Sequence, residues 1–218
     1  MLKQFPYKIL LLFCLMLSYG EVKAAGCCNP CTDDPDCCNP CGAKSVIEFR
    51  GAYLRPDSSN LRDIYGQAWF DFGIEGNAAF YNYYMLFLGL DYTFNDGESL
   101  GEREPTQISI FPLTVGLKAT VRYDYFQPYV GIGPAFIWTW IENDTYNPAL
   151  DRNVNFFTVG GIVKVGSYFF VNDVVSLSIF LDYTFARKKF SSCSTSNVER
   201  HNITLNNLKV GAGLGVYF

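Results

Sequence analysis

Apolar and polar residues alternate with a period of two along most of the chain. Near the end, Val210, Ala212, Leu214, Val216 and Phe218 are apolar, and the residues between them are small, amphipathic or charged. A period of two places successive side chains on opposite faces of a β-strand. An apolar strand left as an exposed sheet edge tends to pair with other chains. We therefore expect the segment 209–218 to be the closing strand of a barrel.

Seven earlier segments show the same alternation. They are residues 45–54, 65–75, 84–94, 108–123, 127–140, 154–166 and 175–186. The region from residue 44 onward is long enough for eight spans of about 9–11 residues with their connections. The sequence predicts an all-β protein, an eight-stranded antiparallel up-and-down transmembrane β-barrel over residues 44–218.

The predicted barrel has one bulky apolar face and one face of small and charged residues. A soluble barrel of the lipocalin kind points its apolar face inward. Here the second face is rich in Gly, Ala, Ser and Thr, which suit the crowded interior of eight strands better than a solvated exterior. We therefore expect the apolar face to point outward, toward lipid.

Aromatic residues and connection lengths support this orientation. One predicted interfacial girdle contains Tyr83, Tyr84, Tyr123, Tyr125, Phe126, Tyr168, Phe169, Tyr217 and Phe218, and the other contains Tyr53, Tyr92, Phe94, Trp138, Trp140 and Phe185. Long polar connections are expected at 55–64, 95–107, 141–153 and 187–202, and short ones at 76–82, 124–126 and 167–173. Outer-membrane barrels keep short turns on the periplasmic side. Both termini are then expected in the periplasm.

Composition narrows the class of protein. Charged residues make up 17% of the chain and aromatic residues another 17%, whereas a soluble domain carries about 25% charged residues. The net charge of −4 gives no basic footprint for nucleic acid. We expect membrane lipid, and no nucleic acid, as a partner.

Residues 1–24 have the pattern of a secretory signal peptide. Lys3 and Lys8 precede an apolar core at 9–17, and Val22-Lys23-Ala24 provides a cleavage site of small residues. The alternative is a lipoprotein signal with Cys27 acylated, although Ala24 stands where such signals usually carry Leu. Both alternatives export the chain.

Residues 25–43 form a cysteine-rich segment with an internal repeat. Cys-Cys-Asn-Pro-Cys occurs at 27–31 and again at 37–41. The segment has too little apolar material for a core, so we expect a short disordered periplasmic tether. Its spacing would also suit a metal, but an oxidising periplasm favours disulfides, and we predict no metal site and no cofactor.

Removal of the signal leaves an odd number of cysteines, and all seven are candidate cross-linking residues. They are Cys27, Cys28, Cys31, Cys37, Cys38, Cys41 and Cys193. Cys193 falls in the last outer connection, separated from the other six by a membrane core of about 30 Å. A disulfide needs Cα atoms within about 7 Å, so Cys193 is expected to be free or paired with another protein.

Ten charged residues fall on the predicted inner face. The carboxylates are Glu48, Asp71, Glu75, Asp91 and Asp182, and the cations are Arg50, Lys118, Arg122, Lys164 and Lys209. Eight strands leave little more room than side chains fill. We expect an interior ion-pair network in preference to a proton or solute relay, which argues against an open pore.

Two stretches resemble known families. The closing strand resembles the Phe-ended strand by which bacterial outer-membrane barrels are recognised by their assembly machinery, which would make Phe218 an assembly signal. Residues 37–53 are similar to the start of cysteine-crosslinked outer-membrane proteins of obligate intracellular bacteria, which implies disulfides to other cysteine-rich envelope proteins. The barrel looks like the OmpA membrane domain and the OmpW and opacity proteins, without the peptidoglycan-binding domain of full-length OmpA.

These features predict a structural barrel of the outer membrane that presents four surface loops, meets a host surface and cross-links to the envelope. Resemblance to OmpW implies the alternative, a carrier or narrow channel for small apolar solutes. Barrel enzymes that deacylate lipid A carry a His-x-Ser motif, but here His201 is followed by Ile203 at the Ser position. We therefore expect no enzymatic activity.

Overall fold

The computed structural model describes residues 45–218 except 82, 99–103, 124, 144–152, 173 and 195–196, with no side-chain description for residues 81 and 189–203. The predicted signal peptide and the cysteine-rich segment lie outside the described residues. Nine strands and one helix make up the described chain. They are β1 (Val46–Pro56), α2 (Ser59–Tyr65), β2 (Trp69–Tyr81), β3 (Tyr84–Glu98), β4 (Pro105–Thr120), β5 (Phe126–Asn143), β6 (Asn153–Phe170), β7 (Val175–Ser194), β8 (Asn197–Thr204) and β9 (Asn207–Tyr217).

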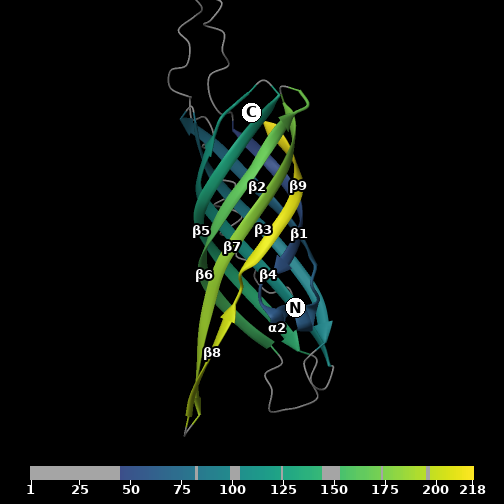
Figure 1. Cartoon of the computed structure of the whole chain (residues 1–218), viewed down its shortest axis with the longest axis vertical. Coiled ribbons are helices and arrows are strands. Elements are labelled where there is room, and N and C mark those ends of the chain that lie inside the picture. Colours follow the sequence, from purple (N-terminus) through teal and green to yellow (C-terminus); the bar gives the residue numbers. More distant parts are fainter. Residues whose placement is uncertain are drawn as a thin grey trace, which may run out of the picture.

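The strands form one closed antiparallel barrel (Figure 1). Strands β1 to β7 each pair with the next strand, and β9 pairs with both β1 and β7, which closes the sheet. The short strand β8 pairs with the C-terminal part of β7, so eight strands form the closed barrel. The predicted eight-stranded antiparallel β-barrel is confirmed.

The apolar face points outward. Ile132 is 63% exposed and Ile179 is 59% exposed, whereas the side chains of Glu48, Lys118 and Lys164 are fully buried. This arrangement is the reverse of a soluble protein, because burying a charge is costly and exposing large apolar residues to water is unfavourable. If the surrounding solvent is apolar, the exposed apolar residues no longer carry this cost. The same alternation along each strand places the polar residues in the interior.

Two predicted loops contain regular structure. The connection at 55–64 carries α2, which ends where Gly66 adopts a φ of 83°. The connection at 187–202 is mostly a β-hairpin formed by β7 and β8, and it projects beyond the rest of the barrel at the α2 end (Figure 1). No helix in the described part of the chain is long and apolar enough to cross a membrane.

The predicted girdles need one correction. Tyr168 and Tyr217 are buried inside the barrel, with exposures of 0% and 5%, instead of facing lipid. Their positions have inward parity, since Tyr217 alternates with the exposed Val216 and Phe218. Their position near a strand end therefore led to an incorrect assignment to the lipid-facing girdle. The period of two places both side chains correctly on the inner face.

Candidate functional site: the interior of the barrel

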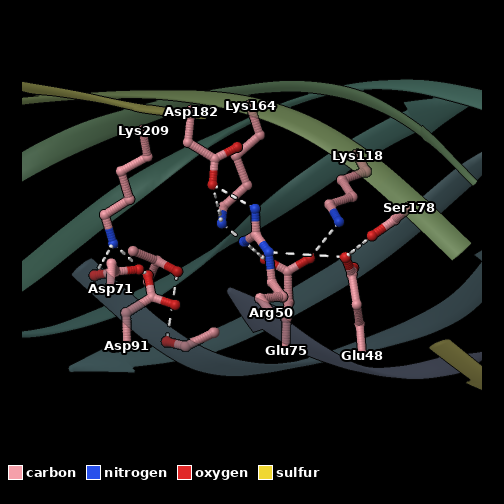
Figure 2. A network of polar contacts seen from close by, with 12 residues as sticks. Glu48, Arg50, Asp71, Glu75, Asp91, Lys118, Lys164, Ser178, Asp182 and Lys209 are labelled. Carbon is pink, nitrogen blue, oxygen red and sulfur yellow. Dashed lines mark hydrogen bonds and ion pairs between the residues drawn. The ribbon is translucent and has the colours of Figure 1, made fainter. Parts of the chain in front are cut away.

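Charged side chains from several strands point toward one another in the lumen (Figure 2). Glu48 and Arg50 lie on β1, Asp71 and Glu75 on β2, Asp91 on β3, Lys118 on β4, Lys164 on β6, Asp182 on β7 and Lys209 on β9. Each of these residues is at most 5% exposed. Side chains alternate in direction along each strand, so these charged residues point inward. Because the sheet closes into a barrel, strands that are distant in the sequence face one another across the lumen.

Six of these residues form a central cluster: Glu48, Arg50, Glu75, Lys118, Lys164 and Asp182. Glu75 accepts from Arg50 Nη1 at 2.9 Å and from Lys164 Nζ at 2.7 Å, and it is also paired with Lys118. Arg50 Nη2 donates to Asp182 Oδ2 at 2.7 Å, and Lys164 Nζ lies 3.2 Å from the same oxygen. Glu75 thus joins three cations that come from three different strands.

Glu48 extends the central cluster toward the C-terminal end of the barrel. Its carboxylate accepts from Tyr168 OH at 3.2 Å and from the hydroxyl of Ser178, and it lies 3.8 Å from Arg50 Nε. Lys118 Nζ donates to Tyr168 OH at 2.9 Å. The neutral Tyr168 hydroxyl therefore connects Glu48 to Lys118. Together with the Ser178 hydroxyl, it gives the carboxylate the hydrogen bonds that a buried charge requires.

A second group, the Lys209 cluster, consists of Lys209, Asp71 and Asp91. Lys209 Nζ lies 2.8 Å from Asp71 Oδ2 and 2.9 Å from Asp91 Oδ2, and Thr93 also donates to Asp71. This cluster has two carboxylates for one cation. The central cluster has three of each, so its formal charges cancel.

Two of the buried cations also make cation–π contacts with aromatic rings. The Arg50 guanidinium carbon lies 3.6 Å from the centroid of the Phe180 ring, and Lys118 Nζ lies 4.1 Å from that of Tyr129. Cation–π contacts gain strength when they are shielded from water. The rings therefore fill space beside the cations and stabilise their charge.

Small residues make room for these long side chains. A Cβ atom placed on Gly213 would lie 2.5 Å from Glu48 Oε1 and 2.6 Å from Ser178 Oγ, and one placed on Gly131 would lie 2.9 Å from Lys118 Cγ. The glycines on the inner face thus mark positions where a neighbouring strand extends a polar side chain.

Arg122, the tenth residue of the predicted network, lies apart from both clusters. Its guanidinium carbon lies 4.6 Å from the centroid of the Phe170 ring. Arg122 falls just beyond the end of β4, where the polar face leaves the middle of the lumen. The described ion pairs bring the other nine predicted residues together and leave Arg122 at the C-terminal end.

The other end of the lumen is filled by an apolar plug, which sequence reasoning did not anticipate. Its buried members include Leu54, Trp69, Phe87, Ile108, Ile110, Ile137, Ile162 and Leu205, and Leu61 and Ile64 of α2 pack against them. The sequence contains a signal for this plug, because Trp69, Ile108 and Ile137 occupy inward-facing positions of their strands. All of the buried plug members except Leu205 lie inside the predicted strands, but the inner face is predicted to be small and charged, so a cluster of large apolar side chains is not expected there.

Hydrogen bonds hold α2 over this plug. Tyr65 OH lies 3.1 Å from Thr106 Oγ1, Trp69 Nε1 donates to Gly66 O at 3.0 Å, and Asn95 donates to Tyr65 O. Tyr65 and Trp69 make an edge-to-face contact with centroids 5.9 Å apart. Burial raises the pKa of the Tyr65 phenol above its usual value, although the contact with Thr106 acts in the opposite direction.

The remaining predicted residues are placed only in part. Cys27, Cys28, Cys31, Cys37, Cys38 and Cys41 lie outside the described residues. The backbone of Cys193 is opposite Val198 in the β7–β8 hairpin, and His201 is on β8 opposite Phe190. Phe218 is 62% exposed, and its backbone N donates to Ser45 O at 3.1 Å. Within the described ranges, no group of His, Cys, Asp or Glu is arranged to hold a metal ion.

Comparisons with known proteins support the architecture. No protein-family model matches the chain, and no curated protein matches its sequence. Among solved structures, the chain is similar to OprG, an outer-membrane protein of Pseudomonas aeruginosa, with 16% identity, a TM-score of 0.62, and coverage of 82% of this chain and 97% of OprG. It is also similar to Neisserial surface protein A, with 15% identity, a TM-score of 0.54, and coverage of 80% and 97%. The fold is that of the small bacterial outer-membrane β-barrels.

Proposed function

We propose that this protein is a sealed structural barrel of the bacterial outer membrane. Its barrel anchors the chain in lipid, its four long connections face outward, and its N-terminal cysteines cross-link it to other cysteine-rich envelope proteins. Both termini are in the periplasm, and the barrel has no catalytic role. The observation that supports this proposal best is the filled lumen.

Two layers fill the lumen one above the other. The central cluster joins residues of β1, β2, β4, β6 and β7 across the barrel, so any passage through the middle has to break ion pairs. The apolar plug occupies the end at α2, where an ion would lose its hydration without compensation. This arrangement suits an anchor better than a diffusion pore.

A planar-bilayer recording tests the sealed barrel. We expect no stepwise conductance from folded protein at low applied voltage, because an ion would have to pass both the buried ion pairs and the apolar plug. Folded state is verified by the altered gel mobility of the unheated sample, and an open porin inserted under the same conditions is the positive control. Stepwise ion currents from the folded protein would exclude the sealed anchor.

The cross-linking role is tested in envelopes separated on non-reducing and reducing gels. We expect high-molecular-weight species without reductant and monomer with it. Replacing the six cysteines at 27–41 by Ser should abolish these species, whereas Cys193→Ser should leave them largely intact. A monomer on both gels would exclude this role and leave the anchor unaffected.

A specific feature of the wall favours a second candidate, a carrier for small apolar solutes. The pairing of β3 with β4 is interrupted between Leu90–Leu113 and Thr93–Ile110, beside Pro112. The pairing of β4 with β5 is interrupted beside Pro134. Proline has no N–H for the ladder. The first interruption adjoins the plug residue Ile110, and the second adjoins Ala135, which belongs to the same buried apolar cluster.

The two candidates differ in what Pro112→Val does. Pro112→Val restores a backbone N–H, so the hydrogen bonding between neighbouring strands can be completed. If the protein is a carrier that releases its solute through the wall, vesicles containing the variant should take up an apolar fluorescent probe more slowly. A sealed anchor should show the same slow background uptake before and after the substitution. Uptake equal to that of protein-free vesicles in both cases would exclude the carrier.

A further inference from the structure

A shallow groove lies in the outer wall of the barrel, over four neighbouring strands, β3, β4, β5 and β6. Its lining includes Tyr84 of β3, Ala119 of β4, Val130 of β5 and Val165 of β6. The groove has a volume of about 440 Å³, which is within the range of roughly 300–1,000 Å³ of small-molecule sites. We call this hollow the wall groove.

The sequence explains why the wall is hollow at this point. Tyr84 is opposite Ala119, and Ala119 is opposite Val130. Val130 is in turn opposite Val165. Cross-strand partners share a face, and the three larger residues of this row are exposed, so the whole row faces outward. Ala119 has no atom beyond Cβ, and the larger side chains on either side of it therefore form the banks of the groove.

The wall groove lies at the boundary between the apolar band and an aromatic girdle. Toward the middle of the barrel, the exposed pair Leu117 and Ile132 continues the outward face of β4 and β5. Toward the near end of the barrel, Tyr83 belongs to the lining, and the rings of Tyr123 and Phe126 stack 4.7 Å apart. Aromatic residues favour the membrane–water interface. The groove thus joins the interface to the depth of the hydrocarbon.

The chemistry of the lining indicates one class of ligand. The lining contains no charged residue, and its side chains are those of Ala, Val, Pro, Gly, Thr and Tyr. The groove is continuous with the outward apolar band, which contacts lipid in an outer-membrane barrel. Its ten lining residues are fewer than the roughly 20–30 residues on each side of a stable protein interface. These features favour an acyl chain over a second protein.

We propose that the wall groove binds one acyl chain of a phospholipid, in the leaflet nearest the C-terminus, with its headgroup at the level of Tyr83 and Tyr84. In the proposed orientation this is the periplasmic leaflet. The bound chain makes the dispersion contacts that an empty hollow beside Ala119 would lose. This inference rests on the proposed membrane anchor, and it adds one specific lipid site to the wall. Because the lining has no cation, the site selects an acyl chain and is indifferent to headgroup charge.

Native mass spectrometry of the folded protein, released from mixed micelles of detergent and dipalmitoylphosphatidylcholine, counts the phospholipids that each variant retains. We expect the wild type to retain one phospholipid. Ala119→Phe fills the groove and removes on the order of ten chain contacts, which corresponds to roughly ten-fold weaker retention. Ala212→Phe is the matched control, because Ala212 is an exposed alanine of β9, outside the groove, and it should leave retention unchanged.

A second variant and a second lipid separate the groove from effects of folding and charge. Val130→Phe fills the groove from β5 and should weaken retention as Ala119→Phe does. The altered gel mobility of the unheated sample verifies that each variant is folded. Dipalmitoylphosphatidylglycerol should be retained as well as the phosphatidylcholine, because an anionic headgroup finds no cation in the lining.

Equal retention by the wild type and both groove variants would overturn the inference, as would a strong preference for the anionic lipid. A wild-type dimer that Ala119→Phe converts to a monomer would assign the groove to a second copy of the chain and overturn the lipid site. Insertion of the wild type into phosphatidylcholine vesicles without any retained phospholipid would overturn the lipid site alone. Failure of the wild type to insert would overturn the membrane anchor itself.

Discussion

Glu75 is the residue on which most of the interior electrostatics depends. It is fully buried and pairs with Arg50, Lys118 and Lys164. Burying an ion pair contributes little net stability, because desolvation offsets the attraction. Removing one partner is costly, because the other charge remains buried and uncompensated. The network therefore specifies how the strands close more than it stabilises the barrel.

Glu75→Gln is expected to lower the free energy of unfolding by about 3–5 kcal/mol. The substitution leaves three cations facing two carboxylates in the central cluster. Asp96→Asn is the control, because Asp96 is an exposed carboxylate that accepts from Gln107 Nε2 at 2.8 Å, and it should change stability by less than about 0.5 kcal/mol. Urea unfolding in phospholipid vesicles measures both, and equal effects would contradict the buried network.

Two glycines of the wall provide a second residue-scale contrast. A Cβ on Gly133 would clash with Val115 O and lie 2.8 Å from Gly116 Cα, whereas one on Gly51 would have no atom within 4 Å. Backbone atoms cannot move aside without separating β4 from β5. Gly133→Ala should therefore cost about 1–3 kcal/mol, and Gly51→Ala should be neutral or stabilising by up to about 1 kcal/mol. The same unfolding assay decides this, and a neutral Gly133→Ala would refute the close approach.

At the scale of elements, the strands were predictable and the helix and the hairpin extension were not. The alternation around Leu86–Leu90 and Leu177–Leu181 gives both strand and face, because only one register puts the apolar set outward. The helix α2 is a seven-residue segment with no side-chain cap bond and no acidic residue in its first turn. It forms because Leu61 and Ile64 pack on the plug, a tertiary contact that no local pattern contains.

The candidate site was predictable in membership but not in pairing. Period two identified the inward charges on each strand. Which carboxylate meets which cation depends on how the barrel closes, and Arg50 and Asp182 are 132 residues apart in the chain. The sequence likewise predicts a long polar connection at 187–202, where β7 and β8 form a hairpin.

The packing of α2 on the plug should depend on pH through Tyr65. Because burial raises the pKa of Tyr65, its phenol contributes stability that is fully present below the unfolded value of about 10 and is lost as the pH rises through the higher folded value. Wild-type protein should therefore loosen at the α2 end in alkaline solution. The fluorescence of Trp69, whose ring centroid lies 5.9 Å from that of Tyr65, reports the change.

Tyr65→Phe is the matched control for this titration. It removes the ionisable group and keeps the ring, so the alkaline fluorescence change should disappear while the emission near pH 7 stays the same. An identical titration in the variant and the wild type would show that another group is responsible.

At the scale of the whole molecule, the barrel is arranged opposite to a soluble protein. Its middle contains two clusters of buried charge, its α2 end contains an apolar plug, and its outside is a band of Leu, Val, Ile and Phe. The outer band requires a surrounding solvent that is itself apolar, because in water it would be exposed at high cost. The sealed anchor depends on this orientation.

A single pair of substitutions tests the orientation most directly. Ile132, in the middle of β5, and Val171, just beyond the end of β6, are both 63% exposed. In lipid, Ile132→Lys should lower the free energy of unfolding by about 2–4 kcal/mol and Val171→Lys by about 0–1 kcal/mol, because the cost of a charge depends on depth in the bilayer. This difference, measured by denaturant unfolding in phospholipid vesicles, is the predicted result. Equal and small costs at the two positions would contradict a lipid-facing wall.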